Sequence, residues 1–318
     1  MRSYNGTGWL ACVAVSTAAM AGDAPATSRP ATMEVFVTIE PQAALVRAIA
    51  GEQAGVSVLV GTGQDAHTYE PTPRQVMTLG RARVYFTVGL PLESRLVEKI
   101  TGAAAGPMIV DTTAGITRKP MVGQHHHGHR HEAASHDGHD GDAGDDHAND
   151  QVELDPHVWL SPPLLKVQAG HVARAMAAVD PPHAADYQAN LGRLLARIDA
   201  VDAKVRQALA PYKGQSFYVF HPAFGYFADA YGLTQRAVEV EGKSPTPRQL
   251  SALIEQAKAD GVQILFVQPQ FDPRSAQVVA QAIGGAVLRM DPLAPDVLGN
   301  FEVMADAIQK AFDARGGK

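Results

Sequence analysis

Short runs of β-branched and aromatic residues alternate along most of the chain with stretches whose apolar positions recur at helical spacing. The runs of the first half, from residue 33 on, are MEVFVTI, VSVLV, ARVYFTV and PMIV. Those of the second half, after residue 214, are SFYVF, TQRAVEV, VQILFV and AVLRM. Strands that alternate with helices are typical of parallel sheets. The pattern therefore predicts an α/β protein of two lobes, each with a mostly parallel sheet flanked by helices.

A single long helix is predicted between these lobes. From Tyr187 to Leu209 apolar residues recur every three or four positions, which indicates a helix over residues 184–210. At 1.5 Å per residue it is roughly 40 Å long, enough to lie across both lobes as a rigid connection. We therefore expect an N-terminal lobe at 33–180, the linking helix at 184–210 and a C-terminal lobe at 214–318. An ordinary long core helix is the alternative that the sequence leaves open.

The pentapeptide PTPRQ occurs at 71–75 and again at 245–249, each time ahead of an amphipathic stretch and then a strand. Thr72 and Thr246 are suited to cap a helix whose first turn holds the proline that follows. The repetition is compatible with two related lobes, and equally with coincidence around a common helix start.

Residues 1–21 have the features of a cleavable secretory signal peptide. Arg2 is their only charged residue, an apolar stretch follows at 9–20, and Ala19 and Ala21 fit the small-residue cleavage pattern. Cys12 is the only cysteine of the chain and lies inside the apolar stretch, which argues against a lipid anchor. We expect export, and a mature chain without disulfides or thiolate ligands. A buried first helix is the alternative.

Charge and length exclude two classes of function. With 27 Lys and Arg against 33 Asp and Glu, the net charge is -6, so the chain offers no basic surface for nucleic acid. The longest apolar run is shorter than the roughly 20 residues that span a bilayer, which excludes a polytopic membrane protein.

Histidine is the residue type that suggests a chemistry, because eight of the 13 histidines lie between residues 123 and 150. This segment mixes histidine with aspartate and glycine and has too few apolar residues for a core, so we predict a disordered histidine-rich loop. Imidazole and carboxylate groups at short spacing bind zinc, copper or nickel weakly. The auxiliary low-affinity metal ligands predicted in this loop are His125, His126, His127, His129, His131, His136, His139 and His147. A solvated acidic loop is the alternative.

Three other histidines and one aspartate occupy equivalent positions. His67 and His221 follow predicted strands, His157 precedes a helix start, and Asp291 follows the strand AVLRM. The carboxyl ends of strands face the ligand crevice in open α/β sheets, so we expect these four side chains to meet at one metal ion. His171 and His183 lie in an amphipathic stretch and a turn, and we expect them to face solvent.

This set of ligands selects the ion. Three neutral imidazoles and one carboxylate suit four-coordinate zinc, whereas manganese favours more oxygen ligands. A catalytic zinc keeps one position open for water, and the sequence contains no H-E-x-x-H, G-x-S-x-G or Walker A motif. A closed four-ligand site favours metal carriage over catalysis.

Six segments, in this order, resemble one family: QDAHTYEPTPRQ, the acidic histidine-rich insert, DPHVWLSP, FHPAFGYFADAYGL, VQPQF and MDPL. Together they are similar to the periplasmic zinc-binding proteins of ABC importers, the ZnuA-type branch of the cluster A-I solute-binding proteins, from about Met33 to the end of the chain. The resemblance implies two α/β lobes joined by a long rigid helix, with one metal ion held between them.

Position by position, the resemblance implies that His67, His157 and His221 are the histidine ligands and that Asp291 supplies the carboxylate. Manganese and iron relatives usually place a glutamate where this chain has His221, which supports zinc.

Two positions depart from the family pattern. Ala66 stands where some zinc members carry an acidic residue, which gives weight to Asp291, and Gln268 stands where zinc relatives often have glutamate. We assign Gln268 no ligand role.

The function implied is high-affinity capture of zinc in the periplasm, as a transported ligand, and its delivery to a cognate ABC permease in the inner membrane. A metallochaperone is a further candidate partner, and we expect a monomer without enzymatic activity. Two alternatives stay open: a metal-binding surface adhesin of the same fold, and a zinc-dependent hydrolase.

Overall fold

The computed structural model describes Met1 and residues 33–101, 106–121, 154–239 and 246–316. Apart from Met1, the predicted signal peptide lies outside these residues, as does the predicted histidine-rich loop with all eight of its histidines. Among the described residues, no helix combines the length and the apolar character needed to cross a membrane.

The first lobe is built on a parallel sheet in the order β2-β1-β3-β4. Its strands are β1 (Met33–Ile39), β2 (Ala54–Val60), β3 (Val84–Thr87) and β4 (Met108–Asp111). The helices that follow in this part of the chain are α1 (Glu40–Ala50), α2 (Pro73–Leu79), α3 (Pro91–Thr101) and α4 (Pro162–Val179). The central strand β1 buries Val35, Val37 and Ile39 completely, as expected for a strand covered on both faces.

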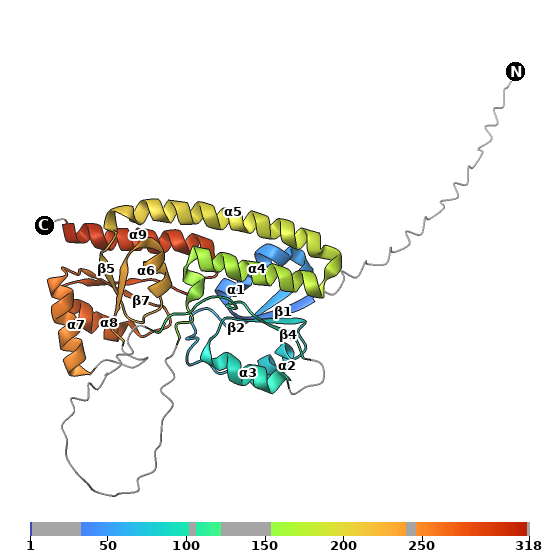
Figure 1. Ribbon diagram of the computed structural model, residues 1–318, viewed down its shortest axis with the longest axis horizontal. Helices are drawn as coiled ribbons and strands as arrows, with labels where there is room; N and C mark the ends of the chain where they lie inside the picture. Colours follow the sequence, from blue (N-terminus) through green and yellow to red (C-terminus); the bar gives the residue numbers. More distant parts are fainter. Residues whose placement is uncertain (2–32, 102–105, 122–153, 240–245, 317–318) are drawn as a thin grey trace, which may run out of the picture. The chain divides into compact units, whose positions relative to one another are not determined.

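The second lobe repeats this arrangement with a parallel sheet in the order β6-β5-β7-β8. Its strands β5 and β7 are labelled in Figure 1. Its strands are β5 (Ser216–Val219), β6 (Thr234–Ala237), β7 (Ile264–Val267) and β8 (Ala286–Arg289). Its helices are α6 (Gly225–Tyr231), α7 (Pro247–Ala259), α8 (Pro273–Ala282) and α9 (Val297–Gly316). The predicted fold class, two α/β lobes with parallel sheets, is confirmed.

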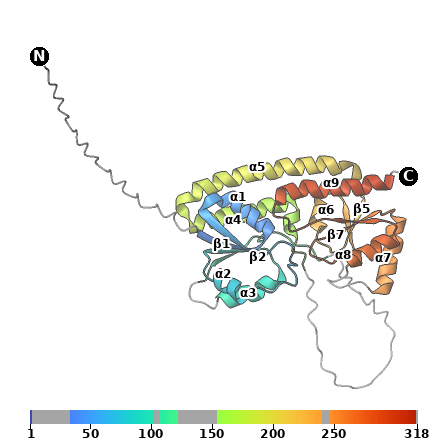
Figure 2. The same ribbon diagram turned by 180° about the vertical axis from the view of Figure 1, so that it is seen from behind.

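The helix α5 (Ala184–Leu209) connects the two lobes over 26 residues. Near its start Asn190 donates a hydrogen bond to the carbonyl of Ile49 in α1, at 2.7 Å. Near its end Arg206 donates to the carbonyl of Ala230 in α6, at 2.9 Å. Both views show α5 lying along α4 and α9 (Figures 1 and 2). One helix is therefore bonded to both lobes.

Two apolar cores hold the structure together. The larger one joins β1 and β3 of the first lobe to α4, α5 and α9, and a smaller one lies between β5, β7 and the helices α7 and α8. Short 3₁₀ turns precede or follow several elements: η1 (Gly51–Gln53), η2 (Val158–Leu160), η3 (Pro181–His183) and η4 (Ala210–Tyr212).

Candidate metal centre

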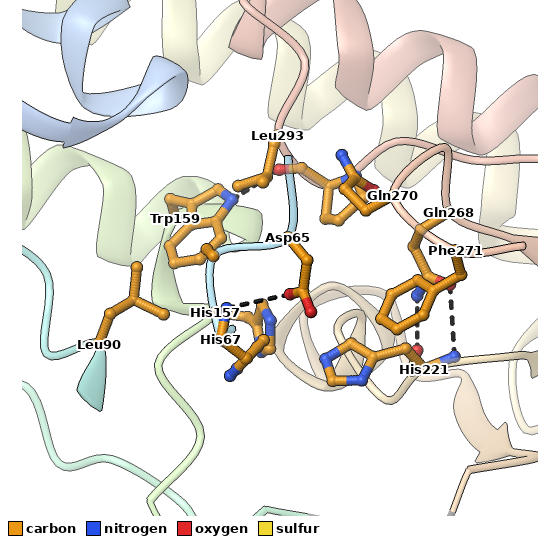
Figure 3. Close-up of a pocket in the computed structure, with 12 residues that line it drawn as sticks. Asp65, His67, Leu90, His157, Trp159, His221, Gln268, Gln270, Phe271 and Leu293 are labelled. Carbon is orange, nitrogen blue, oxygen red and sulfur yellow. Dashed lines mark hydrogen bonds between the residues drawn. The ribbon is translucent and has the colours of Figure 1, made fainter. Parts of the chain in front are cut away.

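Three histidines from separate parts of the chain meet between the lobes. His67 lies in the loop between β2 and α2, His157 directly precedes η2, and His221 lies two residues after β5. Their ring centroids are 4.9 to 5.5 Å apart, and one ligand nitrogen from each ring lies within 4.8 Å of the others. Figure 3 shows the three side chains converging. The structure brings together the three histidines that the sequence singles out.

The loop that carries His67 is shaped by its own polar residues. The Asp65 carboxylate accepts hydrogen bonds from the backbone N–H of His67, at 3.0 Å, and from the Thr68 hydroxyl, at 2.8 Å. Thr72 then caps α2, because its hydroxyl accepts from the backbone N–H of Gln75. Short local bonds of this kind fix a turn without strand or helix pairing.

Two carboxylates orient the other two rings. Asp155 bonds the Nδ1 atom of His157 at 2.7 Å, and Glu239 bonds the Nδ1 atom of His221 at 2.5 Å. A ring that donates its Nδ1–H to a carboxylate presents the lone pair of Nε2 on its opposite side, and this arrangement is common behind histidines that bind metals.

The sequence analysis missed Asp155 and Glu239. The pattern D-P-H places a carboxylate two residues before a candidate ligand, and this was a usable signal for Asp155. Glu239 lies two residues beyond the end of β6, and its N–H donates to the carbonyl of Phe220 at 2.9 Å, which places it beside His221. Without the strand pairing, no sequence pattern identifies it.

Gln268 holds the backbone of His221 from both sides. Its side-chain oxygen accepts from the His221 N–H at 3.3 Å, and its amide nitrogen donates to the His221 carbonyl at 2.6 Å. Both the oxygen and the nitrogen of the Gln268 side-chain amide are thus hydrogen-bonded to the backbone of His221. The ring of Phe271 stacks on the His221 ring at 5.2 Å.

The three rings border a small, largely apolar cavity of about 20 Å³, which has room for about one water-sized atom. Its apolar lining includes Leu90, Trp159, Phe271, Pro292 and Leu293.

Within the described residues, the Nε2 atom of His221 is buried without a hydrogen-bond partner. An unpaired buried nitrogen is costly, and a bound cation would satisfy it. Tetrahedral zinc with bonds of about 2.0–2.1 Å puts its ligand nitrogens roughly 3.4 Å apart. Small movements of the rings are enough to reach that spacing.

The protonation of His67 suits a metal ligand. Burial, followed by the neighbouring rings of His157 and His221, lowers the pKa of His67 from 6.5 to about 2. The protonated, charged form of the His67 ring would be poorly solvated there and would be repelled by the neighbouring rings if they were charged. At neutral pH the His67 imidazole is therefore uncharged, and its lone pair is available.

Asp291 is not part of the close histidine group. Its Oδ1 atom accepts hydrogen bonds from the Gln270 side chain and from the backbone N–H of Leu293, both at 2.9 Å. Its predicted role as a fourth ligand stays a prediction.

The two histidines expected to face solvent also lie outside the group. His171 and His183 are both partly exposed; the ring of His171 bonds the carbonyl of Ala114 at 2.9 Å, and that of His183 bonds Asp180 at 2.7 Å.

Comparison with known proteins also points to zinc binding. The family model for zinc-uptake complex component A, periplasmic, matches residues 35–311. The high-affinity zinc uptake system protein ZnuA of Paracoccus denitrificans is 30% identical over 284 residues, which cover 86% of this chain and 86% of that protein.

Solved structures resemble the fold over most of its length. A zinc-bound ZnuA crystal structure, of a mutant that lacks residues 138–173 in its own numbering, is 35% identical with a TM-score of 0.76. The match covers 88% of this chain and 98% of that one. The laminin-binding protein of Streptococcus agalactiae has a TM-score of 0.73 at 19% identity, covering 88% of this chain and 99% of that one. At that identity the likeness concerns the fold alone.

Proposed function

The chain belongs to the family of periplasmic component A proteins of zinc-uptake complexes, and from this we propose that it captures a zinc ion with His67, His157 and His221. It is a zinc-binding solute-binding protein of a zinc uptake system. The observation that carries the ligand assignment is the convergence of three imidazoles on one small cavity, with the buried Nε2 atom of His221 unpaired among the described residues.

Asp291 supplies the fourth ligand in this proposal. Its loop already lies against the cavity, since Pro292 and Leu293 line it. Four protein ligands would leave no open position for an activated water, as a zinc hydrolase requires. The proposal therefore has no catalytic step.

Export and delivery complete the proposal. The signal peptide at 1–21 directs the chain to the periplasm, where the loaded protein acts as a monomer and passes zinc to an ABC permease of the inner membrane. The histidine-rich loop collects additional ions at low affinity, and a metallochaperone is a further candidate partner. The proteins of the matching family are periplasmic, which supports this location. No observation favours the adhesin or hydrolase alternatives over zinc uptake.

Competition titration against a zinc chelator tests the histidine ligands. His157→Ala and His221→Ala should each weaken zinc binding by about 100-fold or more, because a total of about 10–16 kcal/mol is shared among four ligands. His171→Ala is the matched control, since its ring is partly exposed and lies outside the centre. Tight binding retained by either ligand variant would contradict the assignment.

Asp291 needs a separate test, because water can also fill a fourth position. Asp291→Ala should weaken zinc binding by about as much as a histidine variant, and X-ray absorption of the native complex should report three nitrogen ligands and one oxygen. An oxygen ligand together with unchanged affinity in Asp291→Ala would identify water as the fourth ligand and exclude Asp291.

A further inference from the structure

The chain segment that ends in His157 is paired with an earlier segment of the first lobe. Pro120 and Leu154 form an isolated antiparallel bridge, and the backbone N–H of Asp155 donates to the carbonyl of Lys119 at 2.7 Å. The ligand is thus delivered by a short paired segment outside both sheets. Such a segment needs support from elsewhere to keep a fixed position.

Helix α6 of the second lobe provides that support through one hydroxyl group. The Tyr226 hydroxyl accepts a hydrogen bond from the backbone N–H of Lys119 at 3.0 Å and donates one to the carbonyl of Asp155 at 3.2 Å. It therefore holds both segments at once. The Lys119 ammonium group lies 5.0 Å from the centre of the Tyr226 ring and pairs with Asp229, also of α6.

The contact reaches the metal centre in one further step. Asp155 is 3% exposed, and its carboxylate bonds both the backbone N–H of His157 at 2.9 Å and the Nδ1 atom of its ring at 2.7 Å. Gly225 packs close to this carboxylate, because a Cβ atom there would lie 3.3 Å from Asp155 Oδ2. The start of α6 therefore fixes the residue that orients the His157 ring.

We infer that Tyr226 is a positioning residue for zinc: its hydroxyl ties the His157 ligand segment to the second lobe and so slows release of the ion. The inference rests on the proposed function, because it assumes that His157 is a ligand. Residues behind metal ligands commonly change metal affinity by about 10–100-fold. Tyr226 acts through Asp155, so we expect a change at the lower end, about tenfold.

Zinc release from the full-length mature protein, measured by stopped flow with excess chelator, tests this inference. Tyr226→Phe should release zinc about tenfold faster, since it keeps the buried ring and loses both hydrogen bonds. Tyr218→Phe is the matched control, because Tyr218 is also buried and its hydroxyl bonds Asp260 at 2.7 Å, in the second core. Thermal unfolding of the zinc-free variants separates folding from binding: a merely structural role lowers the midpoint in both and leaves release unchanged in both.

Two double variants show whether Tyr226 acts through His157. In His157→Ala, adding Tyr226→Phe should not weaken zinc binding further, whereas in His221→Ala the tenfold loss should persist. Equal effects in the two backgrounds, or no effect on release in Tyr226→Phe, would overturn the inference alone. Tight binding by His157→Ala itself would overturn the ligand assignment of the proposed function, and the inference with it.

Discussion

Asp155 and Glu239 each bind the Nδ1 atom of a histidine at the centre and leave Nε2 toward the cavity. Each carboxylate accepts the Nδ1–H and places its negative charge behind a ring that faces a cation, so the isosteric amides, which lack that charge, should weaken zinc binding even where geometry is kept. We expect Asp155→Asn and Glu239→Gln each to lose about tenfold or more in zinc affinity, measured by chelator competition. Asp199→Asn is the control: it removes the charge of an exposed partner of Lys166 and should leave the zinc affinity unchanged. Equal affinities in all three variants would contradict the role of the carboxylates.

Glu93 is a buried carboxyl outside the metal centre, and its effect is on stability. It accepts hydrogen bonds from the backbone N–H groups of Val88, Gly89 and Leu90 and bonds the Thr38 hydroxyl. Burial outweighs these donors and raises the pKa of Glu93 from 4.5 to about 7. The folded state therefore holds this proton more tightly than the unfolded state, and its contribution to stability is full below about pH 4.5 and lost as the pH rises through 7.

Glu93→Gln should remove this pH dependence, because the amide copies the protonated acid. Between pH 5 and pH 8, the free energy of unfolding of the variant should rise relative to that of the native protein by on the order of 3 kcal/mol. Urea unfolding curves at both pH values measure the difference. A difference that does not vary with pH would contradict the raised pKa.

At the scale of single residues, the sequence identifies the three converging histidines better than the residues that support them. His67 and His221 stand out because each follows a run of strand-forming residues. Tyr226 and Glu239 act through backbone and side-chain contacts made across the fold, and such contacts depend on how the lobes pack. The spacing of residues along the sequence does not predict such contacts.

Among the elements, all eight predicted strands are present, because β-branched runs between helical stretches leave few alternatives. The main difference concerns β6, which ends at Ala237, before the end of the predicted run at residue 240. Val238 and Glu239 still bond the carbonyls of Val219 and Phe220. The chain therefore continues beside β5 past the assigned end of the strand.

The two PTPRQ segments begin α2 and α7 with the same cap, since Thr72 and Thr246 each accept a hydrogen bond from the N–H of a glutamine three residues on. Replacing either threonine by alanine should lower the free energy of unfolding by about 1 kcal/mol. Thr72→Ala should also weaken zinc binding, because it loosens the end of the loop that carries His67. Thr246→Ala is the matched control with unchanged affinity. Chemical unfolding measures the change in stability, and zinc titration measures the change in affinity. Equal zinc affinities of the two variants would show that the Thr72 cap does not influence the metal centre.

For the whole molecule, α5 predicts the size of the motion on loading. The helix is bonded to α1 through Asn190 and to α6 through Arg206, and its apolar face belongs to the larger core. A wide closure of the lobes would break these contacts. We expect the radius of gyration from X-ray scattering to change by less than about 1 Å on adding zinc, against roughly 20 Å for a compact chain of this length. A larger compaction would contradict a stiff connection.

The two sheets also share one strand order, with β1 and β5 in matching positions. PTPRQ follows β2 in one lobe and β6 in the other, and these strands occupy the same place in their sheets. Sequence alone leaves coincidence open, because a five-residue match can arise at any proline-capped helix. The matching positions in the two sheets favour related lobes.

The narrow apolar cavity has a consequence for ions other than zinc. Magnesium binds in proteins with several of its waters still attached, because it sheds them reluctantly and prefers oxygen neighbours. A space that admits about one water-sized atom, walled by Trp159, Phe271 and Leu293, cannot take such a hydrated ion, and stripping it would expose magnesium to nitrogen partners that it does not favour. Magnesium would then be excluded by the small size and the apolar lining of the cavity, even without a difference in the strength of the metal–ligand bonds.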